Sequence, residues 1–166
     1  MSYLSTLRYA DIFFGLRTEH LERIASTCRE LTLDKGTLIF EENSPGDEMY
    51  VVARGAVEIQ VSPAILGVES ETGPTTIATL RKGEVFGEIV LVDRGLRSAS
   101  AVVAADNTRL LVIRRQDLIA LCEVDHELGY LLMRNIAADI AFKIRGADLM
   151  VREQLLWKPG AAKREG

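Results

Sequence analysis

The feature that most constrains the fold is a run of short segments between Leu31 and Arg115 in which apolar and polar residues alternate. In residues 57–61, for example, Glu58 and Gln60 separate three β-branched residues. Turns containing glycine, asparagine or proline lie between the segments. Alternation places apolar side chains on one face of a strand, and short strands joined by turns are typical of antiparallel barrels and sandwiches. The region therefore predicts an antiparallel β-barrel or jelly roll.

Helical periodicity precedes this region. Leu21, Ile24, Ala25 and Cys28 recur at the spacing of one helix face. We expect Thr18 to be the N-cap of this helix, because a hydroxyl side chain accepts hydrogen bonds from the first-turn N–H groups.

Helical periodicity also follows the region. Residues 118–122 predict a short helix, and a longer helix is expected over residues 126–157 with Asp125 as its N-cap. One apolar stripe on the long helix has four-residue spacing and consists of Leu128, Leu132, Ile136, Ile140 and Ile144. A second stripe has seven-residue spacing and consists of Phe142, Leu149 and Leu156. Two stripes need two burial partners, so we expect one to pack on the barrel and the other to form a homodimer.

These patterns together predict the α+β class, mainly β, with a barrel or jelly roll flanked by N-terminal helices and a long C-terminal helix. A chain of 166 residues is long enough for one such core. We expect an N-terminal helical segment, the barrel, the C-terminal helices and a flexible tail over residues 1–30, 31–115, 116–157 and 158–166, respectively.

Residues 83–100, GEVFGEIVLVDRGLRSAS, carry the candidate chemistry and are called the cassette below. Gly87 opens a short apolar helical turn, which lets an anion approach the free N–H groups. Arg97, ten residues later, supplies two parallel donors to a phosphate, and Ser98 adds a hydroxyl. The carboxylate of Glu88 suits a hydrogen bond from a sugar hydroxyl beside that phosphate. The cassette therefore predicts a site for a sugar phosphate.

Each cassette residue, taken singly, also has an ordinary structural explanation. The helix dipole favours Glu88 in a first turn, Gly87 could be a bend, and Arg97 could be a solvated surface residue. The order and spacing of the three within a β region favour the phosphate site.

The sequence resembles the cyclic-nucleotide-binding domain family, which includes catabolite-activator-type regulators, kinase regulatory subunits and gated channels. The resemblance extends over residues 7–156. It is carried by FGEIVL at 86–91, by RSA at 97–99 and by the upstream PGDEMYVVARG at 45–55. It implies a regulatory sensor of cAMP, or of cGMP, that acts on a protein effector not identified by the sequence.

The resemblance also implies roles for individual residues. Glu88 would hold the ribose 2′-hydroxyl, and Arg97 and Ser98 would hold the cyclic phosphate. The backbone amides of Ile89 and Val90 would complete the phosphate site.

Two positions depart from the family pattern and leave an alternative open. Val90 stands where the family has a small residue, and Leu96 stands where kinase-type cassettes have proline. The alternative is a fold of the same family in which Val90 closes the site and the protein is a dimerisation or interaction module. Near the middle of the long helix, where bacterial regulators contact the purine, an ungapped comparison places Lys143, Ile144 and Arg145.

Composition argues against several other functions. The net charge of −4 is not typical of a nucleic-acid-binding surface, and the nine residues after Trp157 are expected to be too few for a helix-turn-helix domain. The two histidines, His20 and His126, lie outside the barrel, so we expect no metal site and no enzyme. Cys28 and Cys122 form no paired motif. With no long apolar stretch and no signal peptide, a cytoplasmic protein without membrane contact is expected.

Overall fold

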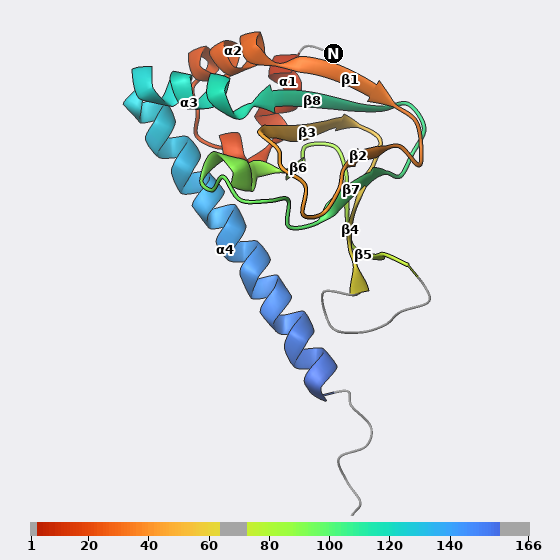
Figure 1. Ribbon diagram of the computed structural model, residues 1–166. Coiled ribbons are helices and arrows are strands. Elements are labelled where there is room, and N and C mark those ends of the chain that lie inside the picture. Colours follow the sequence, from red (N-terminus) through yellow and green to blue (C-terminus); the bar gives the residue numbers. More distant parts are fainter. Residues whose placement is uncertain (1–2, 64–72, 157–166) are drawn as a thin grey trace, which may run out of the picture.

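The computed structural model of the chain describes residues 3–63 and 73–156 (Figure 1). The predicted tail, the predicted helical residue Trp157 and most of the predicted loop between residues 62 and 76 lie outside these ranges. The N-terminal helical elements are α1 (Tyr3–Tyr9), η1 (Asp11–Phe13) and α2 (Thr18–Thr27). The C-terminal helices are α3 (Arg115–Val124) and α4 (His126–Leu156). The strands are β1 (Arg29–Leu33), β2 (Leu38–Phe40), β3 (Glu48–Arg54), β4 (Val57–Val61), β5 (Thr75–Leu80), β6 (Val85–Phe86), β7 (Ser100–Val103) and β8 (Thr108–Arg114).

The strands form two four-stranded sheets in which every pairing is antiparallel. One sheet has the order β1-β8-β3-β6 and the other the order β2-β7-β4-β5. Both sheets therefore contain strands from the two ends of the β region. This is the predicted α+β jelly roll, and the fold-class prediction is confirmed.

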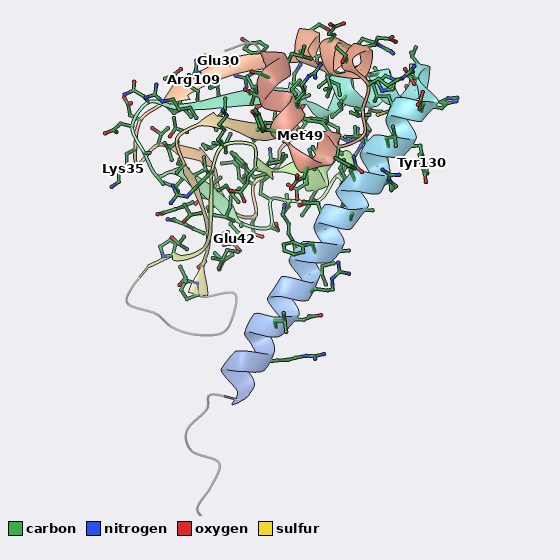
Figure 2. The ribbon with its side chains drawn as sticks, turned by 180° about the vertical axis from the view of Figure 1, so that it is seen from behind. Glu30, Lys35, Glu42, Met49, Arg109 and Tyr130 are labelled. Carbon is green, nitrogen blue, oxygen red and sulfur yellow. The ribbon has the colours of Figure 1, made fainter. Side chains whose placement is uncertain are left out.

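Strand β3 shows that one sheet has an apolar cluster packed on each of its two faces. Met49, Val51 and Ala53 belong to a core cluster shared with the helices, whereas Tyr50 and Val52 belong to a second cluster between the sheets. Because neighbouring residues in a strand point to opposite faces, β3 is apolar at almost every position. Figure 2 shows Met49 between the helices and the strands, where it is fully buried.

The long helix α4 begins where the sequence predicts, since the Leu128 N–H donates to Asp125 Oδ1 over 3.1 Å. Its four-residue stripe is buried at Leu128, Leu132 and Ile136, but Ile144 is 56% exposed. The prediction that the whole stripe packs on the barrel was wrong. At 3.6 residues per turn, a four-residue step rotates the side chain by about 40°, so the stripe leaves the core face.

The outer half of α4 extends beyond the strands (Figure 1). Phe142 and Leu149 of the second stripe are exposed, as is Tyr130, which projects away from the strands in Figure 2. The side chain of Leu156 lies outside the described part of the chain. The second stripe therefore has no burial partner at Phe142 and Leu149 within the chain that is described.

One local prediction was wrong. Thr18 is the first residue of α2 rather than its cap, because Arg17 has the extended backbone of the residue before the helix (φ −68°, ψ 160°). The Thr18 hydroxyl accepts a hydrogen bond from Arg8 Nη2 over 2.8 Å. Strand β7 begins at Ser100, so Arg97 lies in the loop before it. Arg97 pairs through its backbone with the turn that precedes β3, as described below.

Candidate functional site

The backbone of the cassette turns sharply at Gly87, between strand β6 and the short 3₁₀ turn η3 (Glu88–Leu91). Gly87 has a φ of 72°, in the left-handed region that favours glycine. A Cβ atom here would also lie 2.7 Å from Arg97 Nη1 and 3.0 Å from the Glu48 carbonyl oxygen. Glycine is therefore required both by the turn and by the close approach of the guanidinium.

The guanidinium of Arg97 lies inside the protein, with a residue exposure of only 6%. Its Nη2 donates to the Glu48 carbonyl oxygen over 2.8 Å, and its carbon lies 4.2 Å from the centre of the Phe40 ring. Nε and Nη1 are buried and donate to no acceptor among the described residues. Buried N–H groups without acceptors are rare in folded proteins and call for a functional or structural explanation. The geometry is that of a cation directed at an anion.

The backbone of Arg97 is fixed by the loop between β2 and β3. The Arg97 N–H donates to the Ser44 carbonyl over 2.9 Å, and the Arg97 carbonyl accepts from the Asn43 N–H over 2.8 Å. Gly46 in the same loop packs so closely that a Cβ there would lie 2.4 Å from Arg97 Nε. The cation is therefore held in place by backbone contacts.

Burial lowers the pKa of Arg97 below its ordinary value, while the negative charges of Glu48, Asp47 and Glu88 act in the opposite direction. The guanidinium still carries its charge at neutral pH, because arginine does not lose its proton in proteins. The hydroxyl of Tyr50, beside the site, donates to Glu48 Oε2 over 3.0 Å. Burial, reinforced by Glu48, raises the pKa of Tyr50 to about 12.

Glu88 follows the turn and is also buried, at 3% exposure. Its Oε1 accepts a hydrogen bond from Lys143 Nζ of α4 over 2.7 Å, and Lys143 makes a second ion pair with Asp139 over 2.8 Å. Turn η3 lies beside α4, as Figure 1 shows. The structure thus places a buried carboxylate and a buried guanidinium at the two ends of the same cassette.

The remaining predicted site residues differ in burial. Val90 is buried, its N–H donates to the Gly87 carbonyl over a long 3.4 Å, and its carbonyl accepts from Arg115 Nε over 2.8 Å. Ile89 and Ser98 are exposed. The structure brings Gly87 into contact with Arg97, whereas Ile89 and Ser98 lie at the surface.

Four residues that the cassette pattern alone does not indicate complete this arrangement: Phe40, Gly46, Glu48 and Lys143. Gly46 and Glu48 lie in the upstream segment 45–55, so that segment carried a usable signal. Lys143, which an ungapped comparison places in the middle of the long helix, is paired with Glu88 in the structure.

A second polar cluster lies away from the cassette, where α2 meets the start of α4. His20, Asp125 and Glu127 bring possible metal-ligand atoms within 4.8 Å of one another. However, Arg17 bonds Glu127 and Arg23 bonds Asp125, each over 2.9 Å. Two guanidinium groups already neutralise these carboxylates, so the cluster is an ion-pair network that joins the helices.

Comparison with known proteins identifies the family to which this fold belongs. The family model for the cyclic nucleotide-binding domain matches residues 30–125, which include both sheets and the cassette. The chain belongs to the cyclic nucleotide-binding domain family. Domains of this family bind ligands and regulate, rather than catalyse.

Individual members of the family resemble the chain over different lengths. The cyclic AMP receptor protein of Thermus thermophilus is 35% identical over 143 residues, which are 86% of this chain and 61% of that protein. The crystal structure of the Thermus thermophilus catabolite activator protein superposes with a TM-score of 0.72 at 34% identity, covering 87% of this chain and 63% of that one. Human cGMP-dependent protein kinase 2 is 31% identical over 69% of this chain and 14% of its own length.

This cyclic nucleotide-binding domain therefore spans about three fifths of the Thermus receptor and a small part of the kinase. Across residues 3–63 and 73–156, none of its helices has the length and hydropathy needed to cross a membrane.

Proposed function

We propose that this domain is a sensor that binds a cyclic nucleotide through the cassette. The observation that carries the proposal is the pair of buried Arg97 N–H groups that have no acceptor among the described residues. A cyclic phosphate carries one negative charge and exocyclic oxygens, which suit a guanidinium able to donate two parallel hydrogen bonds. Arg97 would neutralise the phosphate, and Gly87, which has no side chain, would leave room for the phosphate and the guanidinium.

The other predicted residues would complete the site. Glu88 would accept a hydrogen bond from the ribose 2′-hydroxyl. Ser98 and the amide of Ile89 would contact the phosphate. The amide of Val90, which donates to the Gly87 carbonyl over 3.4 Å, would do so only by giving up that hydrogen bond. Because Val90 has its side chain buried and Arg97 still has free donors, we do not favour the alternative in which the domain binds no nucleotide.

We propose cAMP as the ligand, with cGMP as the second choice. The relative that matches the larger share of this chain is named for cyclic AMP, and the kinase relative is named for cGMP. A serine at position 98 suits either purine.

Signalling would pass through α4 to a protein effector. The exposed Phe142 and Leu149 favour a homodimer in which two α4 helices cover each other. We place the domain in the cytoplasm, as a regulatory module that acts without nucleic acid, membrane or metal. The cassette and barrel would sense the ligand, and residues 116–157 would transmit its binding.

Thermal denaturation of the full chain during titration with cAMP, cGMP and linear 5′-AMP tests the proposal. A ligand at 100 times its dissociation constant stabilises the native state by about 2.7 kcal/mol. For a domain of this size, that free energy raises the melting temperature by about 5–10 °C. We expect this shift with cAMP and not with 5′-AMP. If neither cyclic nucleotide raises the melting temperature at millimolar concentration, the proposal is wrong.

A further inference from the structure

The ring of Phe40 lies against the guanidinium of Arg97, although Phe40 belongs neither to the cassette nor to the upstream segment 45–55. The guanidinium carbon is 4.2 Å from the centre of the ring, well within the distance of about 6 Å at which a ring face attracts a cation. Phe40 is the last residue of β2, which pairs with β7, and the loop after β2 pairs through its backbone with Arg97. The path of β2 therefore brings the ring and the cation together.

Two other aromatic rings hold the ring of Phe40 in place. Tyr50 and Phe86 are paired across β3 and β6, and their rings stack with centres 4.9 Å apart and planes 12° apart. Phe40 packs on both in a tilted arrangement, with its centre 5.8 Å from that of Tyr50 and 5.9 Å from that of Phe86. Offset and tilted pairs of rings are favourable. Phe40 is therefore a fixed surface for the guanidinium, supported by the opposite sheet.

The other contacts of the guanidinium leave the orientation of its plane open. One hydrogen bond, from Arg97 Nη2 to the Glu48 carbonyl over 2.8 Å, holds one atom, and the plane can turn about that atom. Nε and Nη1 have no acceptor among the residues that the structure describes. Because the guanidinium is planar, the direction of its N–H groups follows from the orientation of its plane. Phe40 contacts the central carbon, so it restrains that orientation.

We propose that Phe40 is a positioning residue for the phosphate contact. Its ring fixes the plane of the Arg97 guanidinium, so that the free N–H groups point to one exocyclic oxygen of a cyclic phosphate rather than to the other. These two oxygens are not equivalent, because one is axial and the other equatorial on the phosphate ring. This inference rests on the proposed function, and it gives the site a stereochemical preference at phosphorus that comes from a residue outside the cassette.

The two diastereomers of cAMP phosphorothioate test this preference, because each has sulfur in place of one exocyclic oxygen. Sulfur is a weak hydrogen-bond acceptor, so the diastereomer with sulfur at the oxygen that Arg97 contacts should bind the wild type about tenfold more weakly than the other. Phe40→Leu keeps an apolar side chain but removes the ring. The ratio of the two affinities should then fall below about threefold. The affinity for cAMP should fall about fivefold, because binding must immobilise the guanidinium.

Isothermal titration calorimetry of the full chain with cAMP and both phosphorothioates measures these affinities. Phe40→Tyr keeps the ring and is expected to keep the wild-type ratio. The matched control is Phe13→Leu, since Phe13 is 3% exposed and belongs to the core cluster on the helix side of the sheet. This control should lower the melting temperature without changing the ratio or the cAMP affinity. Should Phe40→Leu fail to fold, Phe40→Met also removes the ring and fills an irregular space.

Nuclear magnetic resonance of the free protein tests the contact without a nucleotide. A proton above the face of an aromatic ring resonates upfield of its usual position. We expect the Nε–H proton of Arg97, identified by its loss in Arg97→Met, to resonate upfield in the wild type. It should move downfield in Phe40→Leu and stay in place in Phe13→Leu.

Three results would overturn the proposal. A ratio of phosphorothioate affinities that is the same in the wild type and in Phe40→Leu would show that the ring only supports the fold. A wild type that binds both diastereomers equally would show that the site has no preference at phosphorus. An Arg97 resonance that Phe40→Leu does not move would show that the ring does not cover the guanidinium. Absence of cAMP binding to the wild type would instead reject the proposed function itself, so the two failures are distinguishable.

Discussion

Replacing Arg97 with methionine separates the contribution of its charge to folding from its contribution to ligand binding. The guanidinium makes one hydrogen bond, from Nη2 to the Glu48 carbonyl, and one contact with the Phe40 ring. Nε and Nη1 remain buried without acceptors. Methionine has a similar length, adapts to irregular gaps and contacts aromatic rings favourably. It removes the favourable contacts of the guanidinium and also the unfavourable burial of its two unpaired N–H groups.

The two effects are of similar size. A hydrogen bond from a charged group contributes about 1.5–3 kcal/mol, and a cation–π contact contributes about 0.5–2 kcal/mol. Each buried donor without an acceptor costs about 1–3 kcal/mol, and Arg97 has two of them. We therefore expect Arg97→Met to change the free energy of unfolding by no more than about 1–2 kcal/mol without nucleotide. The corresponding change in melting temperature is within about 2–8 °C.

With nucleotide present, the expected difference is much larger. The wild type should gain about 2.7 kcal/mol at 100 times the dissociation constant, whereas Arg97→Met should gain nothing at the same concentration. Chemical denaturation with and without cAMP measures both quantities. Arg94→Met is the matched control, because Arg94 is an exposed cation in the same cassette. If Arg97→Met lowers the free energy of unfolding by more than about 3 kcal/mol without ligand, the charge of Arg97 is needed for folding. If cAMP still stabilises Arg97→Met, the nucleotide binds elsewhere.

Two further substitutions test the surroundings of the site and the start of α4. Gly46→Ala places a Cβ atom 2.4 Å from Arg97 Nε and Nη2, so the guanidinium must move, and cAMP affinity by calorimetry should fall more than tenfold. Gly146→Ala, where a Cβ meets nothing within 4 Å, is the control and should leave the affinity unchanged. Equal cAMP affinities of Gly46→Ala and Gly146→Ala would contradict the geometry. Asp125→Ala removes the acceptor of the Leu128 N–H and should lower the melting temperature at pH 7. That hydrogen bond, opposed by partial burial and helped by His20 and Arg23, lowers the pKa of Asp125. The stabilisation is therefore present above the ordinary pKa of 3.8 and is lost as the pH falls through the folded value. Melting curves of both proteins should converge in acid, and a constant difference down to pH 2 would refute this assignment.

The sequence predicted the parts of the fold that depend on local period. Alternation in residues 57–61 corresponds to β4, and the apolar positions Leu128, Leu132 and Ile136 lie in the core. It failed at Ile144, because a strict four-residue spacing was taken as one face over five positions although the face rotates with each step. The Thr18 prediction failed because Arg17, one residue earlier, has the extended backbone of the N-cap position, which places Thr18 inside the helix.

The candidate site also has a part that the sequence predicts and a part that it does not. Gly87, Glu88 and Arg97 could be singled out because their order and spacing within the cassette carry the chemistry. The contacts of Phe40 with Arg97 and of Lys143 with Glu88 could not be predicted, because each joins residues more than 50 positions apart in the sequence. No local pattern records such a contact. Only the pairing of the β2–β3 loop with the cassette and the path of α4 bring these residues together.

The arrangement of charges explains why a cyclic nucleotide suits this site better than a simple anion. Arg97 is immobilised by the Gly46 and Glu48 backbone, so little conformational entropy is lost when its free N–H groups meet a phosphate. A phosphate alone would use only this end of the cassette. Glu88 would repel a second negative charge but would accept a hydroxyl, so the proposed site would favour a ligand with one charge and a sugar beside it.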